Sequence, residues 1–328
     1  MKFGTINDNG RPTVVVRIGD AGVCRLTELC RAAGIKPYDS LLDLIEQVDD
    51  MAGLDAKLSA HVSRVPVLDE NAVEWLPPIA RPSKIIGVAF NNRKLVETAH
   101  KDPGVPNFFL KPPSALQAHG KPIRVNPEWG AVIPEPELCA VIGTRCKEVD
   151  VREALDYVFG YAIHNDVTSH GLKFQKDSIA VTYNKDMARP EFFGWRRSHG
   201  DDDRDMYYVY HTRSKGTDTF GPMGPWVTTR DEVPKPDELT VQADLDGELF
   251  AIDSTANYRF SVAACIAEAS RYFTLEPGDV MSFGTTAKGQ GRFTYGHKSV
   301  LMGEVTGVIG ISIDPLGRLE NPIEHIGS

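Results

Sequence analysis

The stretch PEPELCAVIG, residues 134–143, decides both the fold and the site that we expect. Its apolar run Leu138–Ile142 is typical of a buried strand. Glu135 and Glu137 stand two positions apart beside this run, and in an extended chain such residues project to the same face. Two carboxylates on one face can hold one cation. Because the chain has 45 acidic residues, pairs of this spacing also arise by chance, so the spacing alone is a hypothesis.

A third carboxylate follows another apolar run. Asp166 ends the segment AIHND, residues 162–166. Three oxygen ligands favour a hard cation such as Mg²⁺ over Zn²⁺, which prefers nitrogen and sulfur. The residues therefore suggest a metal site made of Glu135, Glu137 and Asp166, with chance spacing as the alternative.

From Lys84 onward the chain consists of short apolar runs separated by Gly and Pro. These runs predict strands at Ile85–Phe90, Leu138–Ile142, Leu239–Ala243, Val280–Phe283 and Val305–Ile313. Helical spacing is found chiefly in Val151–Phe159 and Ser261–Tyr272. Since strands and helices do not alternate regularly, we expect a β-rich α+β fold and not a doubly wound sheet.

Residues 1–80 are predicted to form a small N-terminal α/β unit, which leaves 81–328 as the main domain. Phe3–Ile6 and Thr13–Ile18 flank the turn signal of residues 7–10, which predicts a β-hairpin. Leu26–Ala33 and Ser40–Met51 have helical spacing. A cluster of prolines at positions 77, 78 and 82 marks the exit from the unit.

Composition narrows the classes of function. The chain has 36 Lys plus Arg against 45 Asp plus Glu, a formal charge of −9, which argues against a nucleic-acid partner. No apolar run approaches the roughly 18 residues that cross a bilayer, and no signal-peptide core is seen, so we expect no membrane partner. The five cysteines contain no C-x-x-C pair, which is typical of reduced thiols in a cytoplasmic protein.

Two nucleotide-binding motifs can be dismissed. The segment GTTAKGQ, residues 284–290, has the glycine spacing of a P-loop, but no Lys-Ser/Thr pair follows its second glycine. No G-x-G-x-x-G follows an early strand, so a dinucleotide fold has no support.

Five segments in order carry patterns of one family. They read F-x-K-P-x-S, E-x-E-L-x-x-V-I-G, G-Y-x-x-x-N-D, K-x-x-D-x-F-x-P-x-G-P and T-L-x-P-G-D-V…G-T, at residues 109–114, 135–143, 160–166, 215–225 and 274–285. Each is modest alone, but together they are highly specific. Over about residues 84–323 the chain therefore resembles the fumarylacetoacetate hydrolase superfamily.

This resemblance implies a mixed β-roll or β-sandwich core with a metal at its mouth, commonly in a homodimer. It implies that Mg²⁺ or Mn²⁺ is held by Glu135, Glu137 and Asp166. Lys215 corresponds to the active-site lysine beside the metal.

The resemblance also implies the substrate contacts. The substrate is expected to be a small carboxylic acid whose carboxylate contacts Thr285, in the Gly284–Thr285 pair. Lys111 corresponds to a lysine near the lid and is a further candidate for substrate binding.

The chain departs from the family pattern at the lid. Many members carry N-Y-x-x-H-x-x-E, whose His and Glu activate water. Here Leu95 stands at the His position and Thr98 at the Glu position, and leucine cannot transfer a proton. Glu97 and His100 stand nearby, either as substitutes in a shifted register or as exposed lid residues.

A second departure follows Asp166. His170 replaces the arginine of the family pattern and Lys173 replaces the glutamine. A carboxylate can still bind beside these residues, and a neutral His170 can serve as acid or base near pH 7, although an isolated histidine is as often merely hydrogen-bonded. Residues 174–210 are an insertion, expected to form a flap or dimer contact. Its charged run 196–205 is expected to be a solvated loop.

Three functions are compatible with these residues. The first is a metal-dependent hydrolase or lyase that cleaves a C–C bond in a 2-oxo acid of the acylpyruvate type, in the catabolism of aromatics or sugar acids. The second is an isomerase, hydratase or dehydratase of a 2-oxo or enol acid, which the missing His/Glu dyad favours. The third is a metal-binding scaffold without catalysis, against which the retained Lys215 and Thr285 argue.

Overall fold

The computed structural model describes residues 1–19, 22–97, 99, 102–182, 205–286 and 288–327. Within them the strands are β1 (Lys2–Asp8), β2 (Arg11–Arg17), β3 (Val23–Arg25), β4 (Trp75–Leu76), β5 (Ile85–Ala89), β6 (Asn107–Lys111), β7 (Leu116–Gln117), β8 (Ile123–Val125), β9 (Val132–Ile133), β10 (Pro136–Ile142), β11 (Val158–Asn165), β12 (Thr168–Ser169), β13 (Ser178–Thr182), β14 (Asp205–Val209), β15 (Gly221–Thr229), β16 (Thr240–Leu245), β17 (Glu248–Ser254), β18 (Val280–Thr285), β19 (Val308–Ile313) and β20 (Gly317–His325). The α-helices are α1 (Leu26–Ala32), α2 (Leu41–Gln47), α3 (Met51–Ser59), α4 (Arg93–Val96), α5 (His170–Gln175), α7 (Thr212–Gly216) and α8 (Val262–Tyr272).

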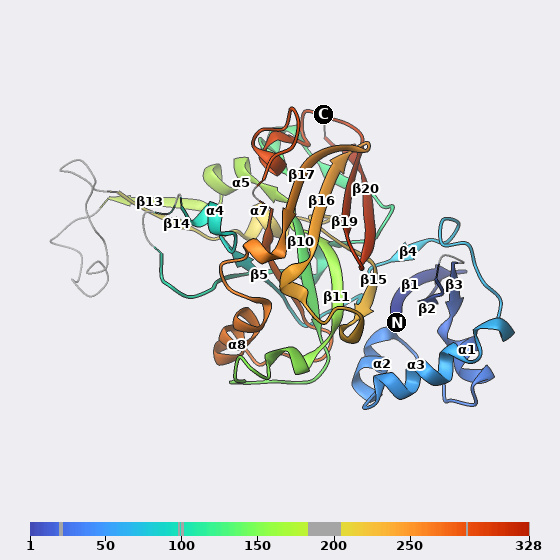
Figure 1. The fold of residues 1–328 in the computed structure, drawn as a ribbon. Helices are drawn as coiled ribbons and strands as arrows, with labels where there is room; N and C mark the ends of the chain where they lie inside the picture. Colours follow the sequence, from blue (N-terminus) through green and yellow to red (C-terminus); the bar gives the residue numbers. More distant parts are fainter. Residues whose placement is uncertain (20–21, 98, 100–101, 183–204, 287, 328) are drawn as a thin grey trace.

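Two sheets form the body of the protein, as the α+β prediction requires (Figure 1). The larger has the strand order β3-β2-β1-β15-β11-β10-β18-β5-β6, in which β4 also pairs with β1 and β7 with β15. The smaller has the order β17-β16-β19-β20-β8. β10, the strand quoted at the outset, lies between β11 and β18 and pairs antiparallel with both.

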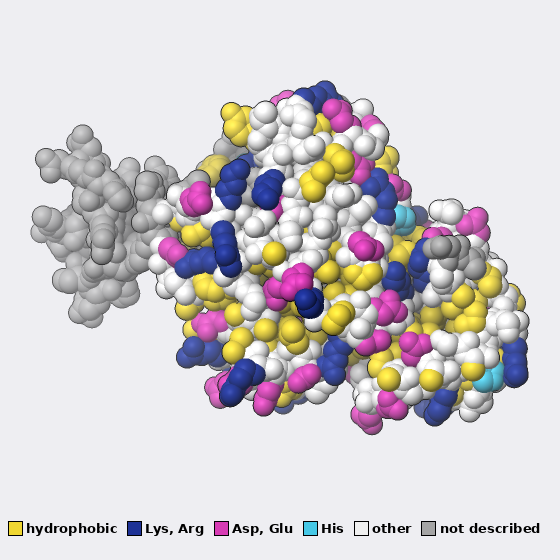
Figure 2. Space-filling view, viewed as in Figure 1, with side chains coloured by type: hydrophobic (Ala, Val, Ile, Leu, Met, Phe, Trp, Pro, Cys, Tyr) yellow, Lys and Arg dark blue, Asp and Glu magenta, His cyan; other side chains and the backbone are white. Residues whose placement is uncertain are grey.

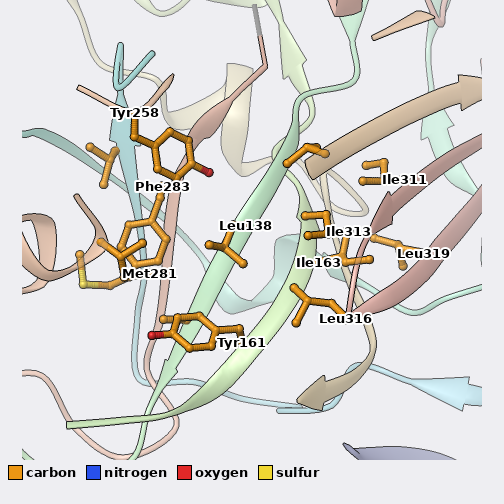
Figure 3. Packing of buried hydrophobic residues seen from close by; sticks show 14 of the residues in the cluster. Leu138, Tyr161, Ile163, Tyr258, Met281, Phe283, Ile311, Ile313, Leu316 and Leu319 are labelled. Atoms are coloured by element: carbon orange, nitrogen blue, oxygen red, sulfur yellow. The ribbon is translucent and has the colours of Figure 1, made fainter. Parts of the chain in front are cut away.

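β10 is buried on both faces, which explains its unbroken apolar run. Leu138 and Ala140 belong to the cluster that also contains residues of the smaller sheet and of α8. Figure 3 shows Leu138 within this cluster, among residues of both sheets. The alternate residues Cys139 and Val141 belong to a second cluster, in which the helices α1, α2 and α3 cover the other face of the large sheet. Because successive side chains of a strand point to opposite faces, β10 contributes to both hydrophobic clusters.

The N-terminal hairpin forms as predicted and extends the large sheet. β1 and β2 pair antiparallel, and both Asn9 and Gly10 at their turn have positive φ, which suits these two residue types. β1 also pairs with β15 of the main domain, through Lys2–Gly4. Strand pairing joins the two units through one continuous sheet, so the sheet itself does not mark a boundary. The division of the chain near residue 80 remains a prediction.

The predicted helix Val151–Phe159 is wrong. The chain there forms a turn and a short 3-10 helix, Ala154–Tyr157, and then enters strand β11 at Val158. β11 pairs with β10 on one side and β15 on the other, and this long-range pairing overrides the local helical pattern.

Two further expectations need correction. The helical pattern Ser40–Met51 is divided between α2 and α3, because Asp50 accepts a hydrogen bond from the Gly53 amide and begins a new helix. The predicted strand Val305–Ile313 begins only at Val308, since Gly307 has a φ of 126°. Residues 183–204, which include most of the charged run, lie outside the described residues.

The surface carries charges of both signs. Figure 2 shows acidic and basic side chains interspersed with apolar atoms on one face of the molecule. The helices of the described residues include none that is long and apolar enough to span a membrane.

Candidate active site

The candidate site is assembled at the ends of adjacent strands. In the antiparallel register, Glu137 of β10 lies opposite His164 of β11 and Thr285 of β18. Asp166 immediately follows β11, and its amide donates to the carbonyl of Glu135. The strand pairing that buries β10 therefore also brings together residues that are far apart in sequence.

Three carboxylates converge at this point. Ligand atoms of Glu135, Glu137 and Asp166 all lie within 4.8 Å of one another. Glu137 and Asp166 are buried, and Glu135 is partly buried. The predicted metal-ligating residues are thus brought into one cluster.

Two lysines neutralise part of this negative charge. Lys215, on α7, places its ammonium 2.7 Å from Glu135 Oε2 and also contacts Asp166 Oδ2. Lys111, at the end of β6, donates to Asp166 Oδ1 at 2.6 Å and to the Phe220 carbonyl at 2.8 Å. Lys111 lies behind Asp166 with a fully buried side chain, so the structure places it against a carboxylate of the cluster and not on the pocket wall.

The pKa values follow from burial and from these ion pairs. Burial tends to raise the pKa of Asp166, but the ammonium groups of Lys111 and Lys215 lower it below its usual range. Burial tends to lower the pKa of Lys215, but the carboxylates of Asp166 and Glu135 raise it above its usual range. Burial lowers the pKa of Lys111, and its ion pair with Asp166 opposes that shift.

Glu137 is the carboxylate without a lysine partner in this cluster. It accepts hydrogen bonds from the Ser282 hydroxyl at 2.5 Å and from the Gly284 amide at 3.0 Å. The Ser282 hydroxyl is also 2.8 Å from Nδ1 of His164, which fixes its position. Burial, together with the carboxylates of Asp166 and Glu135, raises the pKa of Glu137 to about 8.

The donor set fits a hard divalent cation. All three candidate ligands are carboxylates, as Mg²⁺ and Mn²⁺ prefer. When all three are ionised, these carboxylates and the ammonium groups of Lys111 and Lys215 leave one negative charge in excess. The raised pKa of Glu137 shows where that excess charge is least stable, and a cation beside this residue would relieve it.

The carboxylates line a pocket with a volume of about 110 Å³. Of the residues predicted for catalysis or substrate binding, the pocket wall contains His170, Lys173, Lys215, Gly284 and Thr285. The hydroxyl of Thr285 has no hydrogen-bond partner among the described residues, which leaves it available to a ligand.

The segment that holds the His/Glu dyad in other members reaches the same pocket. Leu95, on α4, lines the pocket wall, so an apolar side chain occupies the position of the dyad histidine. Glu97 is exposed and is not among the described residues that line the pocket. Thr98 and His100 lie outside the described residues.

Sequence reasoning missed several residues of the pocket wall. Lys298 and two histidines, His211 and His297, line it together with Phe109, whose ring centroid is 4.6 Å from the ammonium of Lys215. Burial lowers the pKa of both His211 and His297 to about 4, with the nearby lysines contributing, so both rings are neutral near pH 7. No motif contains these histidines, and only a structure can place them here.

A hydroxyl group that sequence reasoning did not identify also contacts the charged cluster. Thr168 donates to Glu135 Oε2 at 3.0 Å and is 2.7 Å from the ammonium of Lys215. It stands two residues after Asp166, between the candidate ligand and His170, and this was the one signal available in the sequence.

Comparison with known proteins places this geometry in a family. The sequence profile described as fumarylacetoacetate (FAA) hydrolase C-terminal matches residues 84–324. A provisionally named hydrolase of Burkholderia ambifaria is 32% identical over 256 residues, which cover 74% of this chain and 78% of that protein.

Solved structures share the whole fold. Maleylpyruvate hydrolase from Sphingobium sp. SYK-6, in complex with manganese(II) ion and pyruvate, is 26% identical with a TM-score of 0.71 and full coverage of both chains. Fumarylacetoacetate hydrolase from Exiguobacterium antarcticum is 26% identical with a TM-score of 0.70, over 99% of this chain and 100% of that one. The chain belongs to the fumarylacetoacetate hydrolase family.

Proposed function

We propose that the protein is a divalent-metal-dependent enzyme that cleaves a C–C bond in a 2-oxo acid of the acylpyruvate or diketo-acid type. The observation that carries this proposal is the cluster of three carboxylates with Lys215 in one pocket. The similar maleylpyruvate hydrolase, whose structure contains manganese(II) and pyruvate, supports the choice of substrate class.

Each residue of the site has a separate role in the proposed reaction. Glu135, Glu137 and Asp166 would hold Mg²⁺ or Mn²⁺, which when bound supplies a Lewis acid for negative charge that develops on a carbonyl oxygen. Lys215 adds a fixed positive charge at the same place, and its ion pairs keep it protonated. The amide of Gly284 orients Glu137. The hydroxyl of Thr285, which has no hydrogen-bond partner in the described part of the chain, can donate to the substrate's carboxylate.

Hydrolysis also needs a group that takes a proton from water. Leu95 cannot do so, and His170 is the predicted residue that stands in the pocket for this task. Burial lowers the pKa of His170, so its ring is neutral near pH 7 and can accept a proton. The carboxylate of Glu135 opposes this shift and raises the pKa of His170, so the basicity of His170 depends on the carboxylate cluster.

A second function is favoured by one specific observation. Leu95 lines the pocket at the dyad position and cannot activate water. Proton transfer between carbon and oxygen of the substrate does not need an activated water. An isomerase, hydratase or dehydratase of a 2-oxo or enol acid is therefore the alternative.

Proton NMR in D₂O distinguishes these functions. The protein is incubated with Mg²⁺ or Mn²⁺ and a panel of 2-oxo acids that includes acylpyruvates and oxaloacetate. Pyruvate that appears with a second acid, or with loss of CO₂, supports cleavage. Deuterium that enters C3 without cleavage supports the isomerase or dehydratase. If the wild type gives neither signal on any substrate, both proposals are wrong. A signal that persists unchanged in the Lys215→Met control does not come from this site.

A further inference from the structure

A fully buried histidine lies beside the carboxylate cluster without belonging to it. In the strand register His164 of β11 is directly opposite Glu137 of β10, and its exposed fraction is 0%. It stands at an unspecified position of the G-Y-x-x-x-N-D pattern, so the family pattern gives it no role. Ala162, two positions earlier on the same face of the strand, is apolar and fully buried. A polar imidazole at position 164 therefore needs an explanation.

The ring of His164 uses only one of its two nitrogens. Nδ1 is 2.8 Å from Oγ of Ser282, whereas Nε2 is buried and has no hydrogen-bond partner in the part of the chain that the structure describes. Burial, with the ammonium group of Lys111 contributing, lowers the pKa of His164 to about 3, so the ring is neutral near pH 7. A buried polar atom without a partner is costly, and the contact with Ser282 is the interaction that accounts for an imidazole here.

The direction of the hydrogen bonds follows from the protons that are available. The Ser282 hydroxyl donates its one proton to Oε2 of Glu137 at 2.5 Å, because an ionised carboxylate can only accept. The contact between His164 and Ser282 then runs from Nδ1–H to Oγ. A neutral imidazole has one N–H, so Nε2 keeps only a lone pair.

These hydrogen bonds fix one oxygen of Glu137 and leave the other available. Oε2 accepts from the Ser282 hydroxyl and also from the Gly284 amide, at 3.0 Å. Oε1 accepts no hydrogen bond from a described residue, and Glu137 lines the pocket. Glu137 is also the carboxylate of the cluster without a lysine partner, so its orientation depends on these neutral donors.

We propose that His164 is a positioning residue for the metal site: its Nδ1–H orients the Ser282 hydroxyl, which holds Glu137 so that Oε1 is presented to the cation. This inference rests on the proposed function, because the cation is the ligand that Oε1 would contact. Residues that hydrogen-bond a metal ligand from outside typically change metal affinity by about 10- to 100-fold.

Two variants of the same shape separate the hydrogen bond from the packing. Asparagine and leucine have the same branched outline, but only asparagine places an N–H donor near the position of Nδ1. The dissociation constant for Mn²⁺ is measured by electron paramagnetic resonance at pH 8.5, above the pKa of Glu137. It is expected to rise about tenfold or more in His164→Leu and to stay within about threefold of the wild-type value in His164→Asn.

The matched control is Thr228→Val. Thr228, on β15, is also fully buried, its hydroxyl has no hydrogen-bond partner in the described chain, and it does not line the pocket. Loss of this hydroxyl should leave Mn²⁺ binding unchanged, which shows that loss of a buried polar group is not in itself enough to weaken the site.

A double variant tests whether His164 acts through Ser282. Ser282→Ala should weaken Mn²⁺ binding at least as much as His164→Leu. The combination of the two should cost no more than Ser282→Ala alone, because the hydroxyl through which His164 acts is already absent.

Nuclear magnetic resonance gives a readout on the wild type, which does not depend on the folding of a variant. Long-range ¹H–¹⁵N spectra of the Mg²⁺-loaded protein show which ring nitrogen carries the proton, and the signals of His164 are assigned by their absence in His164→Asn. We expect the proton on Nδ1.

The outcomes separate this inference from the function on which it rests. A proton on Nε2, wild-type affinity for Mn²⁺ in His164→Leu, or additive losses in the double variant each overturn the inference while the proposed function stands. Equal losses in His164→Leu and His164→Asn also overturn it, because the effect is then one of packing. If the wild type does not bind Mn²⁺ at all, the proposed function itself is wrong.

Discussion

Binding of the metal should depend on pH through Glu137. Its pKa of about 8 means that at pH 7 roughly ten protein molecules in eleven carry a proton on this carboxyl group. A carboxylate must lose its proton to bind a cation, so each pH unit below 8 costs about 1.4 kcal/mol. The dissociation constant for Mn²⁺ is therefore expected to rise about tenfold per unit from pH 8 down to pH 6, and to level off above pH 8.

The free Mn²⁺ signal in electron paramagnetic resonance measures this dependence. Calorimetry in two buffers of different ionisation enthalpy should in addition detect the release of about 0.9 proton per bound ion at pH 7. Glu137→Gln is the matched control, because it keeps the size of the side chain but has no proton to lose. The reasoning is refuted if the wild type binds Mn²⁺ equally well from pH 6 to pH 8, or if the pH dependence persists in Glu137→Gln.

The same shift predicts a stability difference in the metal-free protein. The pKa of Glu137 is raised above the ordinary value of 4.5, so between about pH 4.5 and pH 8 the folded state holds a proton that the unfolded state has lost. This carboxyl group therefore lowers the stability of the folded protein as pH rises through that window. Metal-free Glu137→Gln should unfold at a higher temperature than the wild type at pH 8, with a smaller difference at pH 5, measured by calorimetry.

Other predictions follow from single residues. Lys215→Met should lower turnover at least about a hundredfold and tighten the binding of Mn²⁺, because it removes a positive charge from the carboxylates; kinetics and the Mn²⁺ titration check this. His170→Ala should lower turnover with little change in Mn²⁺ binding, and unchanged turnover means that its acid–base role is wrong. Phe283→Ala, in a fully buried position, should lower the free energy of unfolding by about 3–5 kcal/mol in urea titration. The five buried cysteines should react with a thiol reagent only after denaturation, since burial raises the pKa of groups such as Cys146, to about 11.

The carboxylate cluster could be predicted because its signals are local. Glu135 and Glu137 are separated by one residue at the start of a strand, and Asp166 directly follows the next strand of the sheet. Antiparallel pairing of two consecutive strands then brings the start of one beside the end of the other. The family pattern added Lys215, whose place beside the carboxylates depends on a contact across 49 residues to Asp166.

The remaining parts depend on contacts that no local pattern encodes. Val151–Phe159 has the spacing of a helix, yet its last residues join β11 because β10 and β15 are available on either side. His297 and Lys298 lie in a 3-10 turn without apolar periodicity, so nothing in their own segment indicates a pocket. The first case is a wrong prediction and the second an omission, and in both tertiary structure decides.

The two lysines of the site show why a family pattern must be read together with burial. Both contact Asp166, although the family pattern alone predicts Lys215 for catalysis and Lys111 for substrate binding. Lys111 is fully buried and is fixed by the Phe220 carbonyl as well, so it serves to keep Asp166 ionised beneath the pocket. Lys215 also contacts Glu135 and lines the pocket, so its ammonium group is the one of the two that can interact with a bound substrate.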